Sequence, residues 1–135
     1  MNSPNSSDNW ERGFQERLAK LAPGILDDPV AAFAKLDPEQ QDALLRSLLT
    51  YSCWAQGYNP LTRGPEVIGL LPREWVIKNV ERVLEGMGWD TDVYVARLVL
   101  SLFDGLDRKG LCKRAVERCK KSSDADVREL GVAWK

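Results

Sequence analysis

The sequence contains no histidine among its 135 residues. Histidine is the commonest general base and the usual nitrogen ligand of zinc, so its absence excludes serine-type triads and histidine-containing zinc sites. The glycines form no phosphate-binding loop, and no cofactor motif is visible. Acids remain as the only route to catalysis, because Glu81 and Glu85 lie four residues apart and Asp90 and Asp92 follow. We favour solvated glutamates and helix-capping aspartates, and therefore expect the protein not to be an enzyme.

Cysteine is also scarce, and three thiols cannot form a closed set of disulfides. Cys112 and Cys119 are seven residues apart on one expected helix, about 10 Å along its axis, which is too far for a disulfide or for one zinc ion. We therefore predict that both are buried packing residues and that Cys53 flanks a core stripe. This use of cysteine is typical of a reducing, cytoplasmic compartment.

Long hydrophobic runs and excess charge are lacking as well. No stretch reaches the roughly 20 apolar residues of a membrane span, and the N-terminus has no secretory-signal pattern. The net charge of −1 gives no general attraction to nucleic acid or to a membrane. With 44% apolar and 29% charged residues, the composition is that of one soluble domain. We expect residues 1–7 to be a disordered arm and residues 8–135 to form a single helical domain.

Apolar periodicity predicts an all-α fold of about seven helices. The longest apolar segment, residues 92–106, exceeds strand length and is apolar on nearly every side, so we expect a central helix surrounded by the others. Helix starts are marked by Asp28 before a proline, by Asp37 with Gln40 three residues later, and by Asp107. The other expected helices cover residues 8–21, 30–36, 38–54, 72–87, 108–121 and 125–134, with one or two further turns over 66–71.

Two segments about 32–34 residues apart resemble each other. Residues 82–85 (RVLE) align with 114–117 (RAVE), and residues 90–93 (DTDV) align with 124–127 (DADV). This similarity suggests stacked antiparallel helical hairpins. Residues 123–130 (SDADVREL) also resemble the turn and second helix of a HEAT-type repeat, and the resemblance covers roughly residues 74–134. The resemblance implies a binding scaffold with a buried valine and an arginine near the turn, and an irregular helical bundle is the alternative.

A loop rich in glycine and proline, residues 56–65, interrupts the helical pattern. It presents Tyr58, Leu61 and Arg63 close to Trp54. Tyrosine, tryptophan and arginine most often carry the binding energy of interfaces, and long loops in compact domains are often functional. We predict that these four residues bind a protein partner, as in an adaptor or immunity-like accessory protein. In the alternative, Tyr58 and Leu61 only cover the end of the preceding helix.

Basic residues concentrate between positions 108 and 121, where seven lysines and arginines face Glu117 alone, a net charge of +6. Because the apolar residues of this helix take its inner side, the charges should point to water and can follow a phosphate backbone. The alternative function is therefore nucleic-acid backbone binding through Lys109, Lys113, Arg114 and Lys121. The segment has no aromatic residues for base stacking, so we place this function second to protein binding.

Overall fold

The computed structural model describes the backbone of residues 6–54 and 64–134, and the side chains of residues 12–54 and 65–134. Every regular element in these two stretches is a helix, which confirms the predicted all-α class. The backbone divides into two compact units, residues 1–76 and 77–135, which are described in turn. The single domain expected over residues 8–135 stays a prediction.

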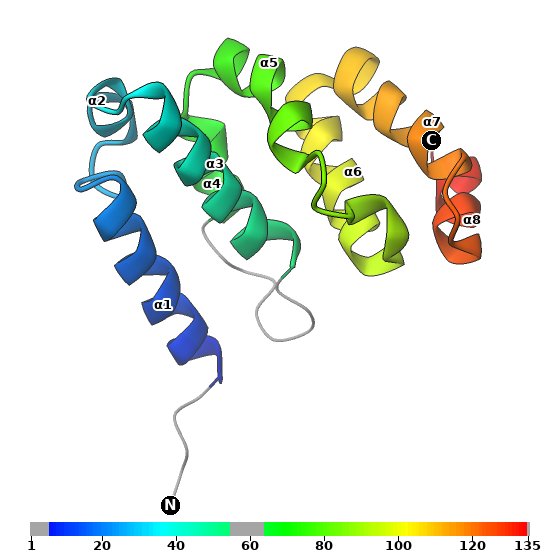
Figure 1. Cartoon of the computed structure of the whole chain (residues 1–135), viewed down its shortest axis with the longest axis horizontal. Coiled ribbons are helices and arrows are strands. Elements are labelled where there is room, and N and C mark those ends of the chain that lie inside the picture. Colours follow the sequence, from blue (N-terminus) through cyan, green and yellow to red (C-terminus); the bar gives the residue numbers. More distant parts are fainter. Residues whose placement is uncertain (1–5, 55–63, 135) are drawn as a thin grey trace, which may run out of the picture. The chain divides into compact units, whose positions relative to one another are not determined.

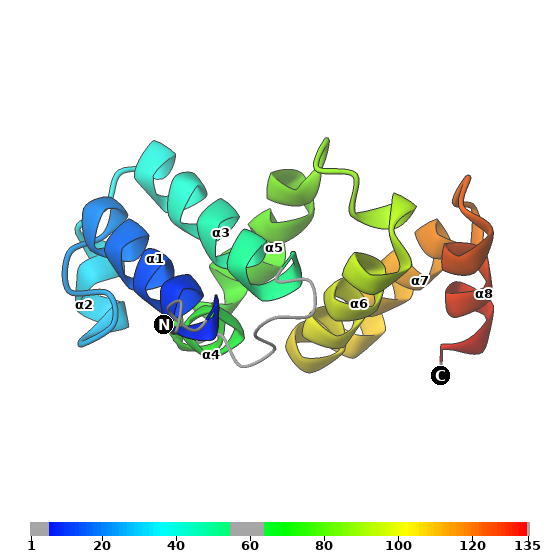
Figure 2. The same cartoon turned by 90° about the horizontal axis from the view of Figure 1, so that it is seen from below.

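The first unit contains α1 (Ser6–Leu21), α2 (Pro29–Ala34), α3 (Pro38–Cys53), α4 (Gly64–Leu70) and the start of α5 (Arg73–Leu84), shown from blue to green in Figures 1 and 2. The predicted caps are present. The Asp28 carboxylate accepts a hydrogen bond from the Ala31 amide. Asp37 and Gln40 form a reciprocal capping box, with nitrogen–oxygen distances of 2.8 and 2.9 Å. These bonds fix where α2 and α3 begin.

The core of the first unit lies where α3 packs against α1 and α4. Phe14 and Leu18 of α1 and Leu44 and Leu48 of α3 are completely buried. Their spacing of four residues on each helix produces the apolar stripe that the sequence predicts. The Tyr51 ring packs edge-on against the Phe14 ring at one end of this contact, with 5.0 Å between the two ring centroids.

The second unit contains the rest of α5, a short 3-10 helix η1 (Trp89–Thr91), α6 (Val93–Asp107), a π-helical turn η2 (Arg108–Cys112), α7 (Lys113–Lys120) and α8 (Ala125–Ala133). Asp92 caps α6 and Asp124 caps α8 through their carboxylates. Asp107 is the last residue of α6 and the N-cap of η2, and its carboxylate accepts hydrogen bonds from the Gly110 and Leu111 amides. The predicted Asp107 cap is therefore present, and it starts a π-helical turn that leads into α7.

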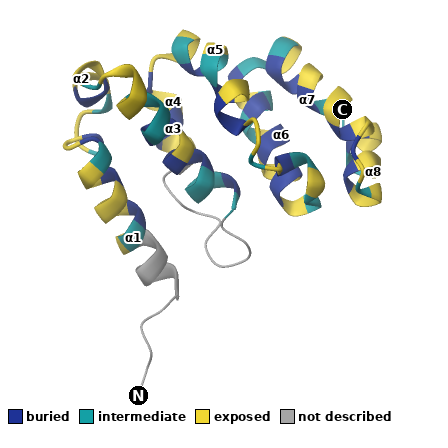
Figure 3. Cartoon of the chain, in the orientation of Figure 1, coloured by how far each residue is buried: buried dark blue, intermediate teal, exposed yellow. Residues whose placement is uncertain are grey.

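The prediction that α6 is surrounded is wrong on one face of the helix. Its inner residues are buried, but Tyr94 and Leu98 are 71% and 41% exposed. Figure 3 shows this exposed face of α6 beside its buried residues. The prediction fails because Tyr94 and Leu98 are apolar by residue type although both face water. They lie four residues apart on one side, in line with the polar Ser101, which marks an outward-facing stripe.

Helices α7 and α8 approach each other closely at Gly131, which is buried. A Cβ atom at this position would lie 2.9 Å from the Lys120 backbone nitrogen and 3.0 Å from the Cys119 Cβ. At the turn before α8, Arg128 donates to the Ser122 carbonyl oxygen at 2.8 Å, and Val127 is completely buried. The HEAT-type repeat stays a prediction.

Candidate functional site

The loop predicted to bind a partner falls mostly outside the described part of the chain. Tyr58, Leu61 and Arg63 all lie outside the described residues. The fourth residue, Trp54, follows the last residue of α3 and is half-buried, with its amide donating to the Thr50 carbonyl oxygen at 3.0 Å. Trp54 is therefore held at the end of α3, and the binding role of the loop stays a prediction.

Two arginines of the basic segment are paired with acids from α5 and from the segment that joins α5 to α6. Arg114 forms a bidentate ion pair with the Glu81 carboxylate. Its Nε lies 3.0 Å from Oε2, and its Nη2 lies 2.9 Å from Oε1. Arg118 reaches Asp90 at 2.8 Å and Glu85 at 3.2 Å. We call these five residues the ion-pair network. It ties α7 to α5 and η1 within the second unit.

The aromatic ring of Trp89 packs against the Arg118 guanidinium of this network. The Arg118 guanidinium carbon lies 5.5 Å from the ring centroid, within the range of a cation–π contact. Hydrogen bonds from Arg118 to Asp90 and Glu85 raise the pKa of the arginine, and the bond from Arg114 to Glu81 does the same for Arg114. Both guanidiniums therefore keep their charge at any physiological pH.

The ion-pair network changes the interpretation of the acids. Glu81, Glu85 and Asp90 serve as partners of arginines, so the prediction that Asp90 caps a helix is wrong, whereas Asp92 is a cap as predicted. The cavity beneath the network measures about 40 Å³. It has room for a few water molecules only, which is too little for a substrate.

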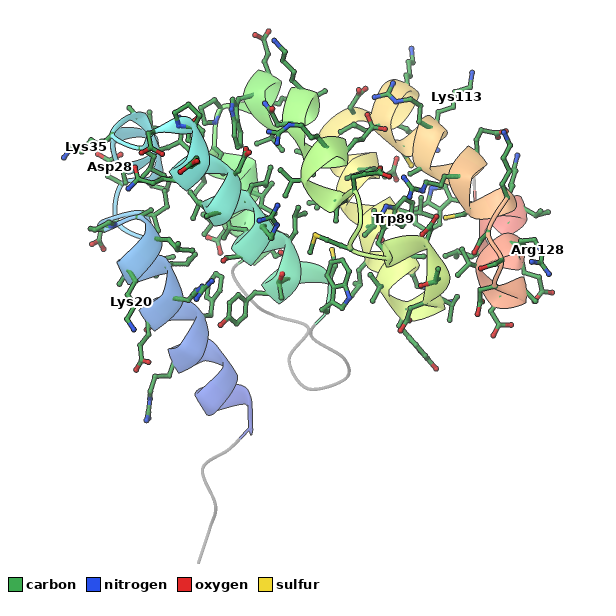
Figure 4. The ribbon with its side chains drawn as sticks, viewed as in Figure 1. Lys20, Asp28, Lys35, Trp89, Lys113 and Arg128 are labelled. Carbon is green, nitrogen blue, oxygen red and sulfur yellow. The ribbon has the colours of Figure 1, made fainter. Side chains whose placement is uncertain are left out.

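The same contacts lower the positive charge of the basic segment. Arg108 also pairs with Asp104, at 3.5 Å. Seven bases then stand beside five acids, Glu117 and the four partners outside the segment, so the local net charge falls from +6 to +2. Of the predicted phosphate contacts, Arg114 is engaged by Glu81. The other three are exposed lysines without an ion pair to any described residue: Lys109, Lys113 and Lys121. In Figure 4, Lys113 extends away from its helix.

The three cysteines are buried, as predicted for Cys112 and Cys119 and for the flanking position of Cys53. Burial raises the pKa of Cys53 to about 12 and that of Cys119 to about 11. Such thiols stay protonated at neutral pH and are poor nucleophiles. Among the described side chains, no group of three or more is arranged to hold a metal ion. None of the described helices combines the length and the apolarity that crossing a membrane requires.

The exposed face of α6 was missed by sequence reasoning. Tyr94 and Leu98 point outwards one turn apart, and Arg97 is exposed beside them without an ion pair to any described residue. We call these three residues the α6 stripe. A tyrosine and an arginine flanking an exposed leucine are typical of binding surfaces. The signal in the sequence was the spacing of Tyr94, Leu98 and Ser101, which places all three on one side of the helix.

Comparisons of the chain with protein-family models, with curated proteins and with solved structures found no match.

Proposed function

We propose that the protein is a non-catalytic helical domain that binds a protein partner through the α6 stripe. The exposure of Tyr94 and Leu98 is the observation that supports this proposal. Large apolar side chains that stay in water on an otherwise apolar helix gain free energy when a partner covers them. The loop residues Tyr58, Leu61, Arg63 and Trp54 are the second proposed contact.

The chemistry of the α6 stripe suggests the kind of partner. Tyr94 and Leu98 are one helical turn apart, which matches the spacing of apolar residues on a partner's amphipathic helix. Arg97 has no acidic partner among the described residues, so a carboxylate on the partner helix would complement it. We therefore propose a partner helix with an apolar stripe and at least one acidic residue beside it. The three buried, protonated thiols of the protein itself suit a reducing compartment such as the cytoplasm.

The test compares two double variants as bait in soluble extract of the native cell, with retained proteins quantified by mass spectrometry. A protein retained by the wild type and by Tyr58→Ala, Arg63→Ala, but lost with Tyr94→Ser, Leu98→Ser, supports the α6 stripe. Circular dichroism checks that each bait is folded, and Ser101→Ala is the matched control on α6. If the retained protein is lost only with the loop variant, the α6 stripe is not the binding surface. If wild type and both variants retain the same proteins, protein binding through either surface is refuted.

The alternative function is binding of a nucleic-acid backbone by the basic segment. The exposed Lys109, Lys113 and Lys121 favour it, whereas the pairing of Arg114 with Glu81 weakens it. Three lysine–phosphate contacts predict a slope of about −2.7 when the logarithm of the association constant is plotted against that of the salt concentration. The assay is fluorescence anisotropy with random-sequence duplex DNA. An absence of binding at low salt would eliminate this function.

A further inference from the structure

A groove of about 400 Å³ lies between α1 and α3 in the first unit. Its walls are Arg17 from α1 and five residues of α3: Ala43, Arg46, Ser47, Thr50 and Tyr51. Cavities of a few hundred cubic ångströms are the usual size for small-molecule sites. Because both helices are anchored in the same core by Phe14, Leu18, Leu44 and Leu48, the walls of the groove are fixed relative to each other.

Among the described residues that line the groove, two carry a positive charge and none is an acid. Arg17 and Arg46 are exposed, and neither has an ion pair with any described residue. This contrasts with Arg114 and Arg118 in the second unit, which both hold carboxylates. Two guanidiniums on facing helices repel each other, and an anion placed between them removes that cost. The groove therefore has the electrostatics of an anion site.

A buried hydroxyl lies in the same groove. The Ser47 residue is only 8% exposed, and its side chain has no hydrogen bond to any described residue. The neighbouring Thr50 hydroxyl, in contrast, donates to the Arg46 carbonyl oxygen at 2.9 Å. A buried hydroxyl without a partner costs free energy, and such groups are rare unless a ligand or water satisfies them. Ser47 is thus an unused hydrogen-bond donor next to two unpaired cations.

We propose that this groove binds the phosphate group of a small molecule. A guanidinium offers parallel N–H groups that match two oxygens of a phosphate, and two guanidiniums offset a charge near −2. The Ser47 hydroxyl donates to a further phosphate oxygen. The remaining volume and the Tyr51 ring accommodate the organic part of the ligand, which makes nucleoside monophosphates suitable probes.

Binding is measured by isothermal titration calorimetry on the full chain, with inorganic phosphate and adenosine monophosphate as separate ligands. Arg17→Gln and Arg46→Gln should each weaken binding at least about tenfold, since each removes charge-assisted hydrogen bonds. Lys20→Gln is the matched control, because Lys20 is on α1 but projects away from α3 and does not line the groove (Figure 4). Tighter binding of adenosine monophosphate than of phosphate indicates that the organic part is also bound. Equal binding indicates that the groove holds the phosphate group alone, which contradicts a small-molecule site.

Ser47→Ala separates a ligand-binding hydroxyl from a structural one. If the Ser47 hydroxyl donates to a bound phosphate, Ser47→Ala binds the ligand several-fold more weakly. Its melting temperature without ligand then stays the same or rises. A lower melting temperature with unchanged affinity shows that the hydroxyl serves the fold, which contradicts this part of the proposal. No saturable binding of either ligand to the wild type, or equal affinities for the wild type and both arginine variants, overturns the phosphate site.

Discussion

Replacing Gly131 with alanine should destabilise the protein. The new Cβ would lie 2.9 Å from the Lys120 backbone nitrogen, 3.0 Å from Cys119 Cβ and 3.1 Å from Lys120 Cγ. Comfortable separations between such heavy atoms are about 3.5–4.0 Å, so α8 must shift away from α7. Overpacking costs about 1–3 kcal/mol, and the nearest atom is backbone, so the upper part of this range applies. Alanine regains about 1 kcal/mol through its helix propensity. The expected net loss is about 2 kcal/mol.

The matched control is Gly105→Ala, on α6. A Cβ at Gly105 meets nothing within 4 Å, and the residue is exposed. Only helix propensity then acts, which should stabilise the protein by about 0.5–1 kcal/mol. The assay is urea denaturation followed by circular dichroism, and the two substitutions should move the midpoint in opposite directions. A Gly131→Ala protein as stable as the wild type would refute the close approach of α7 and α8.

Substitutions at three further positions test the local structure, each by urea denaturation. Asp107→Ala removes the carboxylate that accepts from two amides of η2, and should cost about 1 kcal/mol; Asp107→Asn should recover part of this, and equal losses would contradict the cap. Arg118→Gln removes two ion pairs and the contact with Trp89, a loss of about 1 kcal/mol that should shrink at high salt because the groups are partly exposed; a loss independent of salt would contradict this. The pKa of Cys53 rises from 9.0 to about 12 on folding, so its contribution is complete below pH 9 and is lost as pH rises towards 12. Stability should fall there by up to about 1.4 kcal/mol per pH unit, and less steeply in Cys53→Ala; the same slope in both proteins would exclude Cys53 as the cause.

Local signals in the sequence were sufficient for the helices and their caps. The caps at Asp28, Asp37 and Asp107 depend on residues at most four positions away, so sequence spacing alone predicts them. The C-terminal ends have weaker signals. The apolar segment of residues 92–106 predicts the central helix, and α6 ends one residue later, at Asp107, which also caps the π-helical turn that follows.

Features that depend on distant residues could not be predicted. Arg114 and Glu81 are 33 residues apart, and nothing in either segment indicates that they meet. The basic segment is therefore strongly charged in the sequence, and its counter-charges come from other elements of the fold. The groove between α1 and α3 was missed for the same reason, because Arg17 and Arg46 come together only when the two helices pack.

Buried thiols occur in both units, so thiol labelling can measure how readily each unit opens. Cys53 belongs to the first unit, whereas Cys112 and Cys119 belong to the second. A thiol-reactive probe can modify each sulfur only after the surrounding helices separate, so labelling rates under native conditions measure the opening free energy around each site. Equal opening free energies would mean that the two units unfold together. Unequal ones would mean that each unit unfolds independently.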